Sequence, residues 1–178
     1  MKIAQTLSGA LFLACCLSFS GATVLTQAQA AEQTFYSQME SNYRQLNKIE
    51  DLYERLELAE ESLSKLNAYL LANPKQIQTY LLRAKMNLVF AKIQNERGAT
   101  AIDYWEFVSD VVDPIRSAAY ADLQTVFKHA TEAPLKAEAH YFMADYYLSN
   151  DEPDEALVQQ ELRLACEGGY QIACKETK

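Results

Sequence analysis

The chain has 178 residues, of which 24 are acidic and 16 are Lys or Arg, so its formal net charge at pH 7 is −8. Nucleic acids are bound largely by exchanging counterions for Lys and Arg side chains, so this charge argues against a nucleic-acid partner and against direct binding to anionic membranes. Glycine and proline number only 5 and 4, and residue types that favour helices, such as Ala, Leu, Glu, Gln and Lys, are abundant. The composition predicts an all-α protein.

The first 30 residues have the pattern of a secretory signal peptide. Lys2 gives a positive start, residues 7–25 are largely apolar and uncharged, and Ala28-Gln29-Ala30 places small residues before Ala31. This pattern predicts cleavage after Ala30, a periplasmic or secreted location, and a mature domain over residues 31–178.

Two other interpretations of this segment remain open. A transmembrane anchor needs about 20 mostly apolar residues, and the serines and glycines within the segment dilute its apolar run. A lipid anchor would be attached at Cys15 or Cys16, but Leu13 is bulky where such a motif has a small residue, and the stretch that follows is apolar. With a lipid anchor, the protein would contact a membrane only through its lipid.

Residues 33–72 carry apolar side chains at spacings of three, four or seven, which is typical of one face of a helix. The segment is expected to be one long amphipathic helix or two helices joined near Leu58-Ala59. An unbroken helix would be long enough to pair with a second copy as a coiled coil, so oligomerisation is an open alternative, although buried phenols need polar partners. The row consists of Met39, Tyr43, Leu46, Ile49, Tyr53, Leu56, Leu63, Leu66 and Leu70.

Short breaks separate the helices predicted after this segment. Asn73-Pro74 ends the first one, because a residue before proline avoids the helical region, and Asp113-Pro114 is expected to cap and start a new helix. Because the connections are short, antiparallel neighbours are expected to form one stack of helical hairpins. Helices are predicted over residues 77–94, about 101–112, 114 to about 131, 134 to about 149, and after a turn at 151–154.

Residues 137–174 resemble the tetratricopeptide repeat and, within that superfamily, the shorter SEL-type repeat. Met143-Ala144 matches the large-small pair of the repeat's first helix, Tyr147 its tyrosine, and Ala156 the small residue of its second helix; small residues of this kind lie where helices cross closely. Gln160 and Gly168 depart from the pattern. A weaker match covers residues 59–84, and residues 102–120 would be an inserted or degenerate unit.

The resemblance implies a fold and a set of contact residues. The fold would be antiparallel helical hairpins stacked as a short, irregular tetratricopeptide-like solenoid, with residues 134–178 as its best-matching repeat. Cys166 and Cys174, the only cysteines after residue 30, fall where a SEL-type repeat carries a disulfide. Such solenoids hold peptides in a groove with a few anchors, and the matched frame gives as groove residues Gln78, Leu81, Lys85, Glu138, Tyr141 and Asp145.

Tyr104 and Trp105 lie in an aromatic stretch within the irregular middle of the chain. Aromatic side chains with a polar group are favoured at interfaces, so these two are a candidate contact for a partner. The alternative is that the aromatic residues cap the core of the inserted unit, because adjacent residues cannot all face one side of a helix.

No pattern of catalytic or metal-binding residues accompanies these features. The histidines, His129 and His140, do not have the spacing of a zinc site, and nucleophile motifs and phosphate-binding glycine loops are missing. We therefore expect no enzyme activity, no metal and no cofactor. The expected function is that of an exported interaction or scaffold protein that binds a peptide or protein partner. The alternatives are a β-lactamase-like or penicillin-binding activity, as ascribed to cysteine-bearing SEL-type proteins, and an assembly factor that oligomerises through its first long helix.

Overall fold

The computed structural model of the chain describes residues 27–150 and 152–177. The expected signal peptide therefore lies outside the described residues apart from residues 27–30, and so do Cys15 and Cys16. Over the described ranges the chain forms helices and no β-strand, which confirms the all-α prediction. The long helices are α1 (Gln27–Leu46), α2 (Leu52–Ala72), α3 (Ile77–Gly98), α5 (Asp113–His129), α6 (Ala133–Leu148) and α7 (Glu155–Glu167).

Shorter helical segments lie between and after the long ones. They are α4 (Tyr104–Phe107), the π-helix η1 (Val108–Val112) and α8 (Ala173–Glu176). Among residues 27–150 and 152–177, no helix has the length and apolar character needed to cross a membrane.

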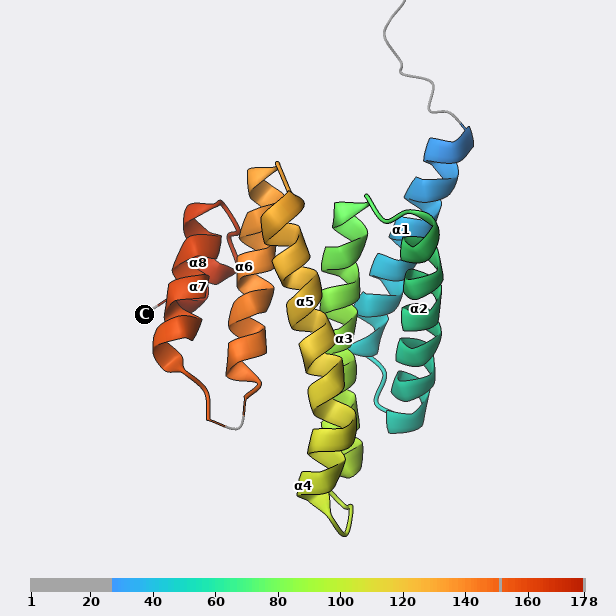
Figure 1. Ribbon diagram of the computed structural model, residues 1–178, viewed down its shortest axis with the longest axis vertical. Helices are drawn as coiled ribbons and strands as arrows, with labels where there is room; N and C mark the ends of the chain where they lie inside the picture. The colour runs from blue at the N-terminus through green and yellow to red at the C-terminus, as the bar shows by residue number, and fades with distance from the viewer. Residues whose placement is uncertain (1–26, 151, 178) are drawn as a thin grey trace, which may run out of the picture.

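Consecutive long helices run in alternating directions and pack against one another in chain order (Figure 1). α1 packs against α2, α3 against α5, and α6 against α7, and the three helix pairs lie side by side. The first helices of the pairs also contact one another, with α3 between α1 and α6. This sequential packing places one side of α1, α3 and α6 on a common face of the molecule.

The segment predicted as one helix or two over residues 33–72 is two helices, and the predicted joint near Leu58-Ala59 is wrong. α1 ends at Leu46 and α2 begins at Leu52. Asp51 caps α2, because its side chain accepts a hydrogen bond from Glu54 N at 2.9 Å, which is the contact of a helix N-cap. Ala59 is fully buried in the middle of α2, so its small side chain permits close packing there.

The path from α4 to α5 also differs from the prediction. Residues 101–112 were expected to form one helix that stops before Asp113-Pro114, but the backbone stays helical from α4 through η1 into α5. In η1 the Asp113 N–H donates to Val108 O, five residues earlier. Pro114 has no N–H to donate, and this wider turn accommodates the missing donor while proline keeps a place in the first turn of α5.

The core is organised around α3, which buries side chains on two sides. Leu82 and Met86 pack with residues of α1 and α2 in one cluster, whereas Leu81 and Leu88 pack with residues of α5 and α6 in another. α3 is therefore the element that fixes α1 and α6 relative to each other.

The C-terminal end is closed by the predicted disulfide, and this prediction is confirmed. Cys166 near the end of α7 is joined to Cys174 in α8, with their Cα atoms 4.7 Å apart. Gly169 turns the chain between them with a φ of 95°, a conformation that favours glycine. The turn lets Tyr170 N donate to Ala165 O at 2.9 Å and sets Tyr170 against α6.

Candidate functional site

The common face of α1, α3 and α6, called here the α1–α3–α6 face, brings together most of the predicted groove residues. Lys85 on α3 and Glu138, Tyr141 and Asp145 on α6 lie on it, and Gln78 is exposed near the start of α3. Leu81 does not reach this face: it is 1% exposed in the core between α3, α5 and α6, so it cannot contact a ligand there.

Lys85 occupies the centre of the face and is almost fully buried, with 5% exposure. Its Nζ atom donates to Glu40 on α1 at 2.7 Å and to Glu138 on α6 at 2.9 Å. The same atom lies 4.9 Å from the ring centre of Tyr43 and 5.3 Å from that of Phe142, within the range of cation–π attraction. A buried charge is tolerated only when it is paired, so this one ammonium group ties three helices together.

The side chains of Lys85, Glu40, Glu138, Tyr43 and Phe142 are called here the Lys85 cluster. Further tyrosine side chains surround it. The Tyr36 hydroxyl donates to Glu40 at 3.4 Å and the Tyr141 hydroxyl to Glu176 at 3.2 Å, while the Tyr170 ring lies 5.0 Å from that of Tyr141. Burial, with nearby carboxylates adding to it, raises the pKa of Tyr36 and Tyr43 well above the ordinary value and raises the pKa of Tyr170 to about 12. The phenols are therefore neutral hydrogen-bond donors at physiological pH.

These raised pKa values predict a loss of stability at alkaline pH. A tyrosine in the unfolded chain ionises near pH 10, so the stabilisation that the neutral phenols provide is complete below about pH 10 and is lost as the pH rises through the higher folded-state values. Each affected tyrosine should lower the free energy of unfolding by about 1.4 kcal/mol per pH unit in this window. Urea unfolding between about pH 9 and pH 12 measures the slope.

The Tyr43→Phe variant is the control for this titration, because it keeps the ring and removes the ionisable hydroxyl. Its unfolding free energy should fall less steeply with pH than that of the parent protein. Equal slopes for the two proteins would show that Tyr43 does not contribute, and that ionisation of the other buried tyrosines, Tyr36 and Tyr170, causes the loss.

Two pockets lie along the face, one on each side of the Lys85 cluster. The first, called the glutamine pocket, has a volume of about 460 Å³ and lies between the start of α1, the end of α2 and the start of α3. Its walls combine amide side chains with rings, and Phe35 stacks on Tyr69 with their ring centres 4.3 Å apart. It is lined by Gln29, Glu32, Gln33, Phe35, Tyr36, Tyr69, Gln76, Gln78 and Thr79.

The second pocket, called the Tyr43 pocket, has a volume of about 290 Å³ and lies where α1, α3 and α6 meet. Lys92, which is about half exposed, pairs with both carboxylate oxygens of Asp145 at 2.6 and 2.8 Å across its rim. Its other walls are mainly apolar and aromatic. The lining residues are Tyr43, Leu46, Asn47, Arg55, Val89, Lys92, Ile93, Tyr141, Phe142 and Asp145.

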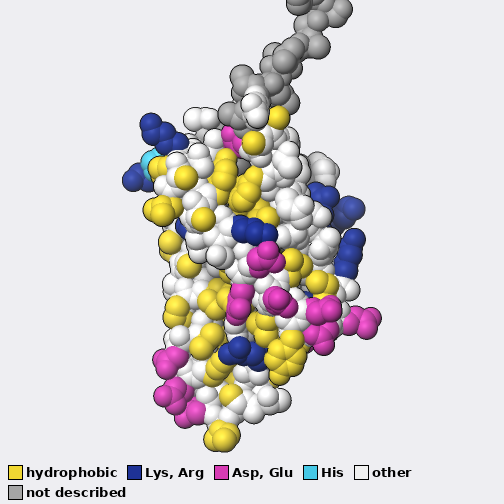
Figure 2. Space-filling view, turned by 90° about the vertical axis from the view of Figure 1, so that its right-hand side faces the viewer, with side chains coloured by type: hydrophobic (Ala, Val, Ile, Leu, Met, Phe, Trp, Pro, Cys, Tyr) yellow, Lys and Arg dark blue, Asp and Glu magenta, His cyan; other side chains and the backbone are white. Residues whose placement is uncertain are grey.

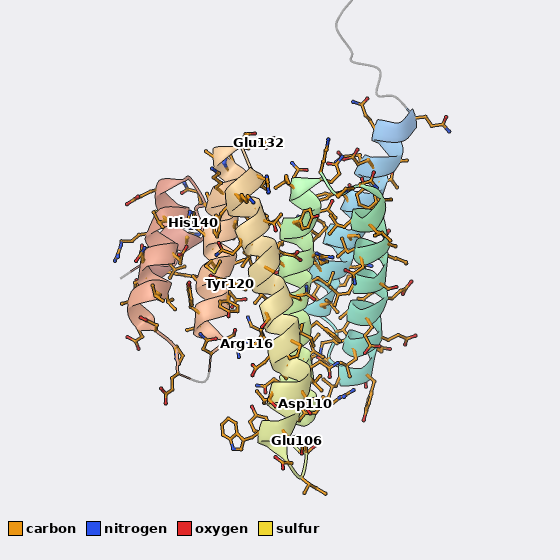
Figure 3. All side chains as sticks on the ribbon, in the orientation of Figure 1. Glu106, Asp110, Arg116, Tyr120, Glu132 and His140 are labelled. Atoms are coloured by element: carbon orange, nitrogen blue, oxygen red, sulfur yellow. A yellow bond between two sulfur atoms is a disulfide. The ribbon has the colours of Figure 1, made fainter. Side chains whose placement is uncertain are left out.

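Tyr104 and Trp105, the two residues predicted as an aromatic contact, have ring centres 5.3 Å apart but differ in exposure. Tyr104 is half-buried against the core, and its hydroxyl donates to Asn95 at 2.6 Å, so it caps this part of the core. Trp105 is 67% exposed and does not cap the core. The tip that carries them also exposes Glu106 and Asp110, as Figure 3 shows.

Polar contacts also join α5 to the end of α6, and α6 to α7. Arg116 lies beside Asn150 and 5.8 Å from the Tyr146 ring, and Figure 3 shows it between α5 and the end of α6. His140 contacts Glu161 on α7 through Nδ1 at 2.6 Å. These contacts join neighbouring helices, so we assign them to packing.

Negatively charged side chains also gather at a place outside the α1–α3–α6 face. Figure 2 shows the end of the stack formed by α1 and α2, where acidic side chains gather; those of Glu54, Glu57, Glu60 and Glu61 on α2 are exposed. In the described part of the chain, no group of three or more His, Cys, Asp and Glu side chains is placed to hold a metal ion.

Comparison of the chain with protein-family models, with curated proteins and with solved structures found no match in any of the three. The assignment of a function therefore depends on the geometry described above.

Several residues of the α1–α3–α6 face were missed at the sequence level. Tyr36, Glu40 and Tyr43 come from α1, which was interpreted as part of an amphipathic segment that packs within the monomer or pairs with a second copy. Tyr170 comes from the turn before α8. One signal was present: Lys85 stands between the apolar residues Ala84 and Met86, and a buried lysine requires a carboxylate partner. The sequence does not say which of its many carboxylates that partner is.

Proposed function

We propose that this chain is an exported helical-repeat protein that binds a peptide or protein partner on the α1–α3–α6 face. The single observation that carries the proposal is the pair of pockets on that face, on either side of the Lys85 cluster. Ligand sites in proteins are concave, with volumes of about 300–1,000 Å³, and combine apolar walls with a few polar groups. The glutamine pocket falls in that range, and the Tyr43 pocket lies near its lower limit. Cleavage after Ala30 would remove Gln29 from the glutamine pocket and leave its other lining residues in the mature protein.

The other features are consistent with this role. Stacked helix pairs whose first helices share one face are the arrangement that tetratricopeptide-like and SEL-type proteins use for peptide binding. A disulfide such as Cys166–Cys174 is favoured in an oxidising compartment, which agrees with export by a signal peptide over residues 1–30.

Site-specific photo-crosslinking in the native cell tests the proposal. A photoreactive residue at Gln78 or Lys92, both exposed on the face, should crosslink to a partner that mass spectrometry can identify. The matched controls are the exposed positions Gln124 on α5 and Glu57 on α2, which lie off the face. Crosslinks from the controls alone, or from Trp105 alone, would place the binding site elsewhere and overturn the proposal.

A further inference from the structure

A second surface lies at the end of the α3–α5 helix pair. We propose that residues 99–110, called here the Trp105 tip, dock into an apolar hollow on another protein whose rim carries Lys and Arg. None of these residues lines the glutamine pocket or the Tyr43 pocket, so this docking does not depend on the function proposed for the α1–α3–α6 face. The shape of the tip, its rigidity, its exposed tryptophan and its charge support the proposal.

The Trp105 tip projects beyond the neighbouring helices. The backbone stays helical from α4 through η1 to the end of α5, a path longer than α6 or α7, which have 16 and 13 residues. Figure 1 shows α4 lying past the ends of α2, α6 and α7 on that side of the molecule. Side chains at the tip are therefore clear of the other helix pairs and can enter a hollow on another protein.

A small core of its own holds the tip in one conformation. Val108 and Val112 are buried, and with Ala91 of α3 they form an apolar cluster against which Phe107 packs. The Phe107 ring lies against the bare backbone of Gly98, where an added Cβ would collide with it. The glycine therefore permits a close approach of the tip to α3.

Trp105 is the large aromatic side chain that this small core leaves outside. Its neighbour Tyr104 packs on the core, whereas Trp105 is 67% exposed. Two hydrogen bonds fix the helical turn that carries it: the Tyr104 hydroxyl donates to Asn95 at 2.6 Å, and Asp103 accepts from Glu106 N at 3.2 Å. A group held in place before binding loses less freedom when it binds, and tryptophan is enriched among the residues that dominate binding energy at interfaces.

The charge around Trp105 indicates the rim of the hollow that takes it. Residues 98–112 contain three acidic residues, Asp103, Glu106 and Asp110, and no Lys, Arg or His. All three are exposed, and Figure 3 shows Glu106 and Asp110 at the tip. Within residues 27–150 and 152–177 no ion pair neutralises them. Interfaces surround an apolar core with a polar rim, so Lys and Arg around an apolar hollow complement this tip.

Two other occupants suit the tip less well. Tryptophan is favoured in the interface of a membrane, but anionic lipid surfaces attract basic residues and repel acidic ones. A second copy of the chain carries the same net charge of −8, and the exposed carboxylates of its α2 would repel an acidic tip. A protein with a basic rim is the occupant that satisfies both the tryptophan and the charge.

A photoreactive residue at Ile102 or Ser109 tests this in the native cell, because both are exposed on the tip and leave Trp105 in place. Both positions should crosslink to one protein, at a site beside Lys or Arg; a site without basic residues would overturn the proposal. The crosslinks should disappear in a Trp105→Ala background. They should persist in the matched Tyr53→Ala background, since Tyr53 is an aromatic residue of α2 with 74% exposure.

Calorimetry with the identified protein measures the contribution of each group. The Trp105→Ala variant should bind at least about tenfold more weakly, as expected for loss of a dominant interface residue. The double variant Glu106→Gln, Asp110→Asn should bind about two- to fivefold more weakly and depend less on salt. Both variants should keep the circular dichroism of the parent, because these side chains are exposed. Parent-like affinity in Trp105→Ala would contradict the proposal.

Trp105 is the only tryptophan in the chain, so its fluorescence reports on the tip alone. In the purified protein its emission should be unchanged by vesicles that contain phosphatidylglycerol and by protein concentration. A blue shift with the vesicles would identify a membrane as the occupant, and a blue shift with rising protein concentration a second copy; either result, or the absence of crosslinks from the tip, overturns the proposal. Crosslinks from the tip without any from Gln78 or Lys92 would instead refute the function proposed for the α1–α3–α6 face and leave the tip as a binding site.

Discussion

Replacement of Lys85 by methionine is expected to lower the free energy of unfolding by about 3–5 kcal/mol, the cost of removing one partner from a buried ion pair. Methionine keeps the length and apolar stem of lysine but leaves Glu40 and Glu138 facing each other without a cation. Both carboxylates are partly buried, so they would repel each other and lose the group that satisfies them. Urea unfolding followed by circular dichroism measures the effect.

Two further variants identify the cause of this loss. The triple variant Lys85→Met, Glu40→Gln, Glu138→Gln removes all three charges and should recover most of the stability, because the uncompensated carboxylates are gone. The matched variant Lys92→Met removes a lysine that is itself about half exposed and should cost no more than about 1 kcal/mol. A loss in Lys85→Met equal to that in Lys92→Met would show that Lys85 does not hold the three helices together.

Among the substitutions, removal of the disulfide is expected to have the second largest effect, a loss of about 1–3 kcal/mol. Cys166 and Cys174 enclose a short loop, and the bond stabilises mainly by restricting the unfolded chain, less so for a shorter loop. The double variant Cys166→Ser, Cys174→Ser should remain folded, because the apolar cluster around Cys166 is formed by residues from α6 onward, whereas the cores of α1–α2 and α3–α5 are separate clusters. Thermal unfolding of this variant and of the parent protein measures the difference.

The parent protein in a reducing agent is the natural control for the double variant, and the two should unfold at the same point. Thiol titration of the denatured, unreduced protein should find the Cys166 and Cys174 thiols blocked. Two free thiols would contradict the bond. Loss of circular dichroism signal across the whole chain in the double variant would contradict its local role.

Helix content and order followed from local patterns in the sequence. Asn73-Pro74 ended α2, and the carboxylate of Asp154 caps α7 by accepting from the N–H groups of Ala156 and Leu157, as the predicted turn before it implied. The break before α2 was missed because the apolar row continues through Ile49 into Leu56. There the capping side chain of Asp51 decides the boundary, not the periodicity.

The irregular middle of the chain was predicted less well for a different reason. Asp113-Pro114 is typical of a helix start, and α5 does begin there, but no turn precedes it. Proline is acceptable in a first turn whether the chain enters from a loop or from another helix. Packing decides that the chain enters α5 from another helix, because Val108 and Val112 of η1 are buried against Ala91 of α3.

The candidate site was predicted on α3 and α6 but not on α1. The resemblance to the tetratricopeptide repeat implied that Lys85, Glu138, Tyr141 and Asp145 share one face. It placed Leu81 there too, although neighbouring positions on α3 pack in opposite directions, with Leu81 toward α5 and α6 and Leu82 toward α1 and α2. Contacts with α1 are long-range pairings, and no local pattern indicates which residues meet across such a distance in sequence.

The Lys85 cluster also determines how independent the three helix pairs are. In arrays where each unit contacts only its neighbours, stability is roughly a sum of local terms, and an end unit can melt while the rest persists. Here Glu40 and Tyr43 of the first pair contact Lys85 of the second and Phe142 of the third. The first and third pairs therefore share contacts directly, and we expect the domain to unfold as one cooperative unit rather than as a modular array that could be lengthened or shortened by a pair.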